Sequence, residues 1–139
     1  MRFLVDANVL SEPTRSRPEP AVTAWLREHE SELVIDPVIL GEIRYGILIL
    51  PKGRKRKLLE SWFEGGIARL RRLEWTGECA LVWAELLATL RRRGRSIPIK
   101  DSLIAATALR HSLTVATRNI ADFKAAGVPV INPFPDLPS

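Results

Sequence analysis

The sequence predicts an α/β fold, a three-layer α/β/α sandwich with a central parallel sheet. Short apolar runs of strand length alternate along the chain with segments of helix length. Alternation of this kind is typical of a parallel sheet that is covered by helices on both faces. The chain has 139 residues, of which 46% are hydrophobic and 27% are charged. This is ordinary globular composition, so we expect residues 1–139 to form a single domain with one core.

The first half of the chain predicts two strands and three helices. In order, they are a strand over 2–5, a loop over 11–20, a helix over about 20–30, a strand over 33–35, a helix over 36–50 and, after a polar turn at 51–53, a helix over roughly 54–68. Asp36 and Pro37 predict the start of the middle helix, because Asp is a favoured N-cap residue and Pro is favoured at the first helical position.

The second half continues the alternation. In order, it predicts a strand near 70–74, a helix over about 77–93, a helix over 101–111, a strand over 113–117, a short helical turn over 119–123 and a strand over 128–132. The helix over 77–93 has apolar residues at helical spacing, namely Ala80, Trp83, Ala84, Leu87 and Leu90.

Positive charge is in excess and is gathered in three short clusters. There are 21 Lys and Arg residues against 16 Asp and Glu residues, a net charge of +5. The clusters are KGRKRK at 52–57, RLRR at 69–72 and RRRGR at 91–95. They suit a phosphate-bearing partner or an acidic protein, although each cluster alone is also consistent with a solvated helix face.

The start of the chain and its single cysteine indicate the compartment. No stretch approaches the roughly 18–20 apolar residues that a membrane span needs, and the first residues contain no signal-peptide core. Cys79 is the one cysteine, which excludes an internal disulfide and fits a reducing compartment. Its amphipathic segment favours a buried thiol. We therefore expect a cytoplasmic protein without a membrane partner.

Four acidic residues stand out by their positions. Asp6 ends the first strand, Asp122 lies just past the strand over 113–117, and Glu42 lies among aliphatic neighbours in a helix. Asp101 begins a helix whose small-residue face can lie close to the sheet, with Ile104, Ala105 and Ala108 on that face. Reactive groups in parallel sheets gather outside the carboxyl ends of the strands, so these acids are candidates for one shared site.

Each of these acids also has a simpler explanation. Asp6 could cap a turn, Asp101 could favour a helix N-terminus, and Asp122 could be a solvated turn residue. Glu42 is harder to explain in this way, because Glu is almost never fully buried unless it is paired.

Several ionised carboxylates can converge only if a cation offsets their repulsion. Hard divalent ions with oxygen ligands do this, and Mg²⁺ in particular uses a few carboxylates and keeps several waters. His29, His111 and Cys79 are isolated from one another in the sequence, which disfavours zinc. The sequence therefore indicates a magnesium site.

Four segments together resemble the PIN-domain ribonucleases of the VapC/FitB toxin type. They are LVDANVLSEP, ILGEIRYGI with the following LPKGRK, GRSIPIKDSLIAATAL, and LTVATRNIADF followed by GVPVINP. The segments occur in the family's order and extend over nearly the whole chain. One departure is Ala7, which stands where many relatives have Thr or Ser, so a hydroxyl near the ligands is missing.

The resemblance implies that Asp6, Glu42, Asp101 and Asp122 form a pocket that holds Mg²⁺ or Mn²⁺. Asp6 and Asp101 are the first choice as direct ligands, while Glu42 and Asp122 could hold a second ion or act through water. The resemblance also implies supporting roles for three polar residues that position carboxylates, water or phosphate, namely Asn8, Thr117 and Asn119.

The activity that the resemblance implies is Mg²⁺-dependent cleavage of RNA by water, as the toxin of a toxin–antitoxin pair. A divalent ion lowers the pKa of water and neutralises the scissile phosphate. Single-stranded or loop RNA is the favoured substrate, because its phosphates can enter a recessed site. The implied protein partners are an antitoxin that covers the pocket and a second copy of the chain, in a homodimer or a larger toxin–antitoxin assembly.

Two other classes of function compete with this one. The first is a non-catalytic PIN-like module that binds nucleic acid or a partner protein without cutting. The second is a phosphoacceptor signalling domain, which requires an Asp at the end of the third strand and a Lys near the last strand. The predicted third strand runs into Glu74 and Trp75, which disfavours the second class.

Overall fold

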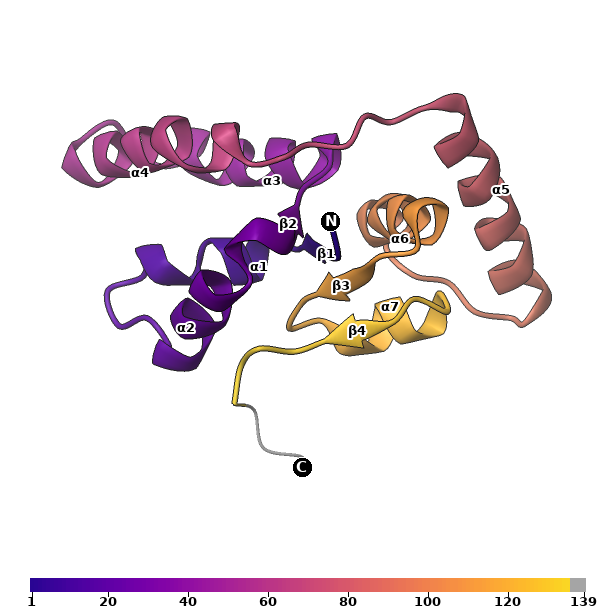
Figure 1. Ribbon diagram of the computed structural model, residues 1–139. Helices are drawn as coiled ribbons and strands as arrows, with labels where there is room; N and C mark the ends of the chain where they lie inside the picture. The colour runs from indigo at the N-terminus through magenta and orange to yellow at the C-terminus, as the bar shows by residue number, and fades with distance from the viewer. Residues whose placement is uncertain (136–139) are drawn as a thin grey trace.

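Residues 1–135 are described by a computed structural model, in which a four-stranded parallel sheet lies among helices (Figure 1). The strands are β1 (Phe3–Val5), β2 (Leu33–Val34), β3 (Thr114–Ala116) and β4 (Val130–Ile131). They are ordered β2-β1-β3-β4 across the sheet, and all three pairings are parallel. The predicted fold class is confirmed.

Seven helices surround this sheet in the described part of the chain. They are α1 (Ala7–Leu10), α2 (Pro20–Glu28), α3 (Pro37–Leu48), α4 (Arg54–Gly65), α5 (Gly77–Arg92), α6 (Ile99–His111) and α7 (Ile120–Ala125). Three short 3₁₀ turns lie between them, η1 (Glu12–Thr14), η2 (Glu30–Glu32) and η3 (Ile67–Arg69).

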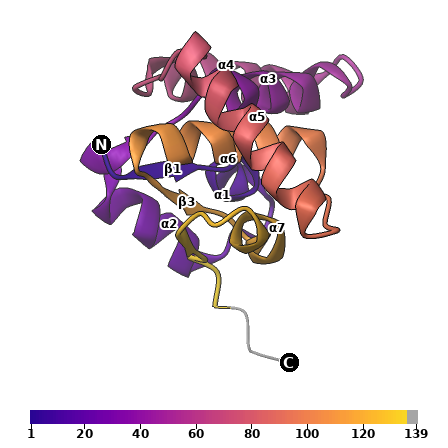
Figure 2. The same ribbon diagram turned by 90° about the vertical axis from the view of Figure 1, so that its right-hand side faces the viewer.

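The helices lie on both sides of the sheet. In Figure 1, α1 and α2 lie to the left of the strands, whereas α6 and α7 lie to the right. The helix α5 packs across the outside of α6, as the side view in Figure 2 shows. The helices α3 and α4 form a hairpin that projects from the body of the molecule.

Strands and helices share a core made of the predicted apolar runs. The residues of β1 are buried, as expected for a parallel sheet covered on both faces. On α6 the small residues Ala105 and Ala108 are buried next to Ile104, so the helix can lie close to the sheet. This close approach carries the first turn of α6 to the carboxyl ends of β1 and β3.

The predicted start of α3 is confirmed at the level of its cap. The carboxylate of Asp36 accepts a hydrogen bond from the Ile39 N–H at 2.9 Å, and Pro37 occupies the first helical position. The second oxygen of Asp36 accepts from the Thr107 hydroxyl of α6 at 2.9 Å. The cap therefore also ties α3 to α6, a contact that the sequence does not predict.

The strand predicted near 70–74 is wrong. This segment makes only an isolated parallel bridge between Ile35 and Arg72, with hydrogen bonds from Ile35 to Arg71 and from Leu73 to Ile35. It lies beyond β2 at the edge of the sheet, and its arginines are exposed. A segment with one neighbour and charged, solvated side chains gains too little from pairing to extend into a strand.

The short helix α1 was missed from the sequence, because four residues are too few to show helical periodicity. Helix ends also differ by a few residues, and α6 begins at Ile99 rather than at 101.

The described residues also test two smaller expectations, on Cys79 and on membrane spans, and show how two tryptophans are used. Cys79 is buried, as predicted. Trp25 packs edge-on against Phe3 with ring centroids 4.9 Å apart, and Trp83 donates a hydrogen bond to Ser102, so both have structural roles. Within residues 1–135, every helix is too short or too polar to span a bilayer.

Candidate active site

Asp6 lies where β1 and β3 end side by side. Its backbone N–H donates to the Ala116 carbonyl at 2.9 Å, which fixes the residue at the carboxyl edge of the sheet. One carboxylate oxygen accepts from the Ala7 N–H at 2.9 Å and so caps α1. The side chain is only 5% exposed. Asp6 therefore caps a helix, where the simpler explanation had it cap a turn, and also presents its second oxygen to the site.

Two of the predicted supporting residues surround that second oxygen. The buried Thr117 hydroxyl donates to Asp6 Oδ2 at 2.8 Å, and the Asn8 amide approaches the same oxygen at 3.4 Å. Asn8 also accepts from the Arg118 N–H at 3.2 Å, so it joins α1 to the loop that follows β3. These contacts hold the carboxylate in one orientation.

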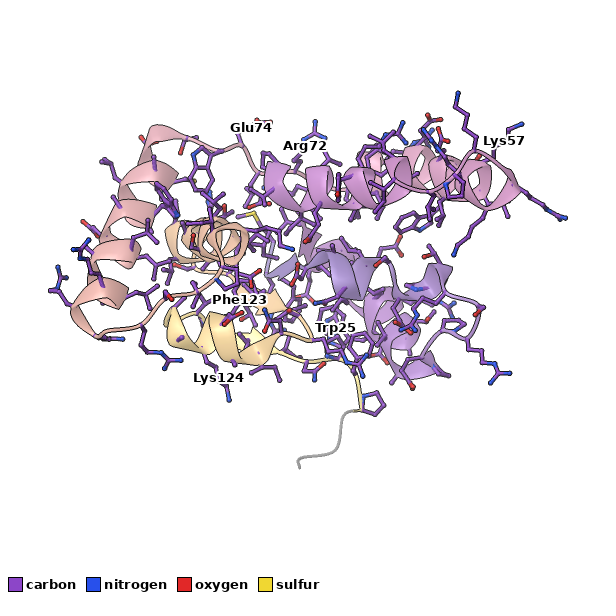
Figure 3. The ribbon with its side chains drawn as sticks, turned by 180° about the vertical axis from the view of Figure 1, so that it is seen from behind. Trp25, Lys57, Arg72, Glu74, Phe123 and Lys124 are labelled. Atoms are coloured by element: carbon purple, nitrogen blue, oxygen red, sulfur yellow. The ribbon has the colours of Figure 1, made fainter. Side chains whose placement is uncertain are left out.

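Asn119 joins two further acids. Its side-chain amide donates to Asp101 Oδ2 and to Asp122 Oδ2, each at 2.9 Å. Its backbone N–H donates to the Thr117 hydroxyl at 2.9 Å, which links this group to Asp6. Asp101 is 5% exposed in the first turn of α6, and Asp122 is partly buried in the first turn of α7. Phe123 beside it points into the core (Figure 3).

Glu42 reaches the site from α3. One of its carboxylate oxygens contacts the ammonium of Lys100, which is the residue before Asp101 in α6. The other oxygen, Oε1, is buried and has no hydrogen-bond partner within residues 1–135. The structure thus brings all four predicted acids to one edge of the sheet, together with Asn8, Thr117 and Asn119.

The electrostatics of the site reflect this crowding. Burial raises the pKa of Asp6, and the negative charge of Glu42 raises it further, while the hydrogen bond from Thr117 acts in the opposite sense. The pKa of Asp101 is raised to about 6, first by burial and then by the charge of Asp6 and by Asp122, whereas Lys100 lowers it. Both carboxylates are easier to protonate than isolated ones, as expected for acids that share a site.

The residues of the site fit a hard divalent ion in their chemistry. They supply carboxylate oxygens, and the buried Glu42 Oε1 is a possible ligand that accepts no hydrogen bond in the described chain. The side chains do not yet form a ligand set, however, because no three His, Cys, Asp or Glu residues among positions 1–135 are grouped so that they could hold an ion. Lys100 holds Glu42 instead, and the Asn119 amide bridges Asp101 and Asp122.

One residue of the site was missed from the sequence. Lys100 is a cation among the four acids, and the signal that could have found it is its position directly before Asp101 in the first turn of a helix. A cation is unfavourable at a helix N-terminus, so a Lys at this position indicates that an acidic group nearby offsets the cost.

A partly apolar cavity of about 240 Å³ opens beside Glu42, between α1 and the α3–α4 hairpin. Its walls include Ala7, Ile43, Ile47 and Trp62. A larger cavity of about 460 Å³ lies between α2 and the end of α4, and none of the four acids lines it.

Comparison with known proteins agrees with this geometry. The family model described as PIN domain matches residues 3–128. The chain is 39% identical over 138 residues to toxin FitB of Neisseria gonorrhoeae, covering 96% of this chain and 99% of FitB. It is 33% identical over 136 residues to the VapC ribonuclease Y4jK of Sinorhizobium fredii, covering 95% of this chain and 97% of that protein.

Solved structures give the same result. The crystal structure of FitAcB from Neisseria gonorrhoeae matches with a TM-score of 0.88 and 37% identity, over 94% of this chain and 97% of that chain. VapBC-5 of Mycobacterium tuberculosis, from the VapBC family of toxin-antitoxin systems, matches with a TM-score of 0.63 and 31% identity, over 72% of this chain and 81% of that chain.

Proposed function

The chain belongs to the PIN-domain family, and from this premise we propose that it is a Mg²⁺-dependent endoribonuclease that acts as the toxin of a toxin–antitoxin pair. The observation that carries the proposal is the convergence of four acids from four separate segments at one edge of the sheet. Burial and mutual repulsion raise the pKa of both Asp6 and Asp101. A protein gains nothing in stability from such crowding unless a cation is bound there.

Asp6 and Asp101 would hold the ion directly, and Glu42 and Asp122 would hold a second ion or act through water. When bound, Mg²⁺ or Mn²⁺ supplies an acidified water and neutralises charge on the scissile phosphate. The chain's own contribution is to fix these oxygens. Thr117 and Asn8 orient Asp6, and Asn119 sets the spacing of Asp101 and Asp122.

A metal-assisted hydrolysis agrees with the side chains that surround the acids. Ser102 is the nearest serine in sequence to a proposed ligand, but its hydroxyl donates to the Ile99 carbonyl and accepts from Trp83. It is therefore engaged in holding the first turn of α6 against α5. Water, rather than a side chain, is the proposed nucleophile.

RNA is the proposed substrate, in agreement with the relative from Sinorhizobium fredii, which is named a VapC ribonuclease. Three basic clusters, at 52–57, 69–72 and 91–95, would hold the phosphate backbone while the acidic site cuts. Acting on RNA, the protein would work in the cytoplasm.

The proposed protein partners are an antitoxin and a second copy of the chain. The cavity beside Glu42 is the proposed seat of an antitoxin segment, because it has partly apolar walls and is lined by one of the four acids, Glu42. A homodimer would cover apolar side chains that are exposed here, namely Tyr45, Leu48, Ile49, Leu81 and Ile99. A larger assembly could combine both contacts.

The test of the proposed function is cleavage of single-stranded RNA by the purified protein with Mg²⁺, beside an Asp6→Asn variant. We expect the variant to cut RNA at least about a hundredfold more slowly than the wild type, because a catalytic ion contributes several kcal/mol to such a reaction. Asn keeps an oxygen that can cap α1, so the fold should persist.

Glu85→Gln is the control, because Glu85 is an exposed acid on α5 outside the site. It should cut like the wild type. Equal RNA loss with Asp6→Asn and the wild type would refute the nuclease proposal and favour the alternative, a PIN-like module that binds nucleic acid or a partner without cutting.

A further inference from the structure

Lys100 places a positive charge inside the acidic site. Its ammonium contacts Glu42, which lies 58 positions earlier in the chain and on a different helix. Asp101 is the next residue in the sequence. Burial raises the pKa of both Asp101 and Asp6, and the positive charge of Lys100 lowers it. One cation of this chain therefore contacts Glu42 and interacts electrostatically with two more of the four acids.

The position of Lys100 is unfavourable for the helix that carries it. Lys100 lies in the first turn of α6, and the Pro98 that precedes this helix provides no side-chain cap. The N-terminal end of a helix is its positive end, so a cation there is disfavoured. The side chain is also half-exposed, and it could extend into solvent at little cost. Attraction to the acids is what explains its place against Glu42.

Glu42 is only half satisfied by this contact. One oxygen touches Lys100, whereas Oε1 is buried without a partner in residues 1–135. A divalent ion that took Glu42 as a ligand would bring two positive charges next to the Lys100 ammonium. The ion and the ammonium cannot share one carboxylate without strong repulsion.

We propose that Lys100 is a built-in counter-cation of the acidic site, which competes with the divalent ion for Glu42 and so lowers the metal affinity of the protein. The inference rests on the proposed function, since it assumes that these acids bind the ion. Lys100 must leave Glu42 before Glu42 can become a ligand. Removing the ammonium should then strengthen metal binding.

The test is titration of the purified protein with MnCl₂ alone, followed by calorimetry and without RNA. We expect Lys100→Met to bind Mn²⁺ about tenfold more tightly than the wild type, the effect of one nearby unit charge at a partly solvated site. Lys100→Arg, which keeps the charge, should stay within about threefold of the wild type. In EDTA, thermal unfolding of Lys100→Met should occur about 2–4 °C lower, because Glu42 loses its partner.

Lys124→Met is the matched control, because it removes the same charge from α7. Lys124 is exposed, points away from the body in Figure 3 and forms no ion pair within residues 1–135. Its affinity for Mn²⁺ should equal that of the wild type. In a Glu42→Gln background, Lys100→Met should strengthen binding only about threefold, since the contested carboxylate is gone and only the repulsion between the ammonium and the ion remains.

The outcomes separate this inference from the proposed function. A wild-type protein that binds no Mn²⁺ would overturn both. Binding by the wild type with equal or weaker binding by Lys100→Met would overturn the inference alone. An equal gain in the Glu42→Gln background would show that Lys100 does not act through Glu42, which also overturns it.

Discussion

Thr117 is a buried hydroxyl that joins two parts of the candidate site. It donates to Asp6 at the end of β1 and accepts from the Asn119 N–H, so the strand-end acid and the loop that holds Asp101 and Asp122 share one oxygen. The residue was assigned a supporting role from its family resemblance alone. The structure gives a physical reason for a hydroxyl at this position, because only a group that both donates and accepts can make this link.

Thr117→Val tests this link with a side chain of nearly the same shape. We expect unfolding in urea to show a loss of about 1–2 kcal/mol, because the Asn119 N–H is left without its acceptor. The pKa of Asp6 should rise further, since the Thr117 hydrogen bond lowers it. Thr114→Val in β3, the strand that Thr117 follows, is the control. If both variants were equally stable, the link would be unimportant.

At the scale of elements, the bond between Asp36 and Thr107 fixes α3 against α6. These two helices carry Glu42, Lys100 and Asp101, so their relative position sets the distance between the acids. Burial raises the pKa of Asp36, and its bonds to Ile39 and Thr107 act in the opposite sense. The carboxylate is thus held by its hydrogen bonds against the cost of burial.

Asp36→Ala should therefore reduce the stability of the protein by more than the loss of an ordinary helix cap does. We expect about 2–3 kcal/mol in chemical unfolding, from the lost cap and from the buried Thr107 hydroxyl that loses its acceptor. Asp36→Asn keeps an accepting oxygen and should lose about 1 kcal/mol or less. If Asp36→Ala lost no more stability than Asp36→Asn, the role given to the Asp36–Thr107 hydrogen bond would be contradicted.

The helix α4 is unusual in its charge. Its first turn carries Arg54, Lys55, Arg56 and Lys57 and no acid, although the N-terminal end of a helix disfavours cations. Arg56 is paired with Glu60, whereas Lys57 extends outward at the end of the hairpin (Figure 3). Four cations at this end of the helix reduce its stability. Their presence is consistent with a surface that binds a polyanion.

The double variant Lys55→Glu/Lys57→Glu separates stability from binding. It should stabilise the protein by about 0.5–1 kcal/mol, because acids suit this end of the helix. It should also weaken RNA binding about tenfold or more at low salt and reduce the salt dependence. Arg91→Glu/Arg92→Glu at the end of α5 is the comparison, and there the change in stability should have the opposite sign. RNA affinity unchanged by the α4 variant would exclude this cluster as a binding surface.

Elements also show where sequence reasoning succeeds and fails. The start of α3 was predictable because a cap is a local signal within four residues. The absence of a strand at 70–74 and the presence of α1 were not predictable, because each depends on contacts with neighbouring segments. The first has only Ile35 to pair with, and the second is stabilised by the carboxylate of Asp6.

For the whole molecule, the alternation of apolar runs was sufficient to predict the parallel sheet, and the sheet was sufficient to predict where its acids meet. The contacts of Lys100 with Glu42 and of the Asn119 amide with Asp101 were not predicted, because the partner of a side chain depends on its conformation and not on the order of the strands. That residues 1–139 form one domain, and that the acids bind metal, remain predictions.

The collective charge of the site predicts how stability depends on pH. Asp101 has a pKa of about 6 in the folded protein, against an ordinary value of 3.8. Between these values the folded state binds the proton and the unfolded state does not, so stability falls as the pH rises through this range. Asp6 and Asp36 act in the same sense, because burial raises the pKa of both. Glu32 and Glu78 have lowered pKa values and act in the opposite sense, but only below about pH 4.5.

In EDTA, the melting temperature should therefore fall from pH 4.5 to pH 7, and the fall should be smaller in Asp101→Asn. Addition of Mg²⁺ should reverse the trend above pH 6 in the wild type, since a ligand that binds the folded state stabilises it and this one requires ionised carboxylates. Melting curves from pH 4.5 to 7.5, with and without Mg²⁺, measure both effects. A wild type whose curves in EDTA are flat, or identical to those of Asp101→Asn, would mean that Asp101 is not crowded by its neighbours as the geometry requires.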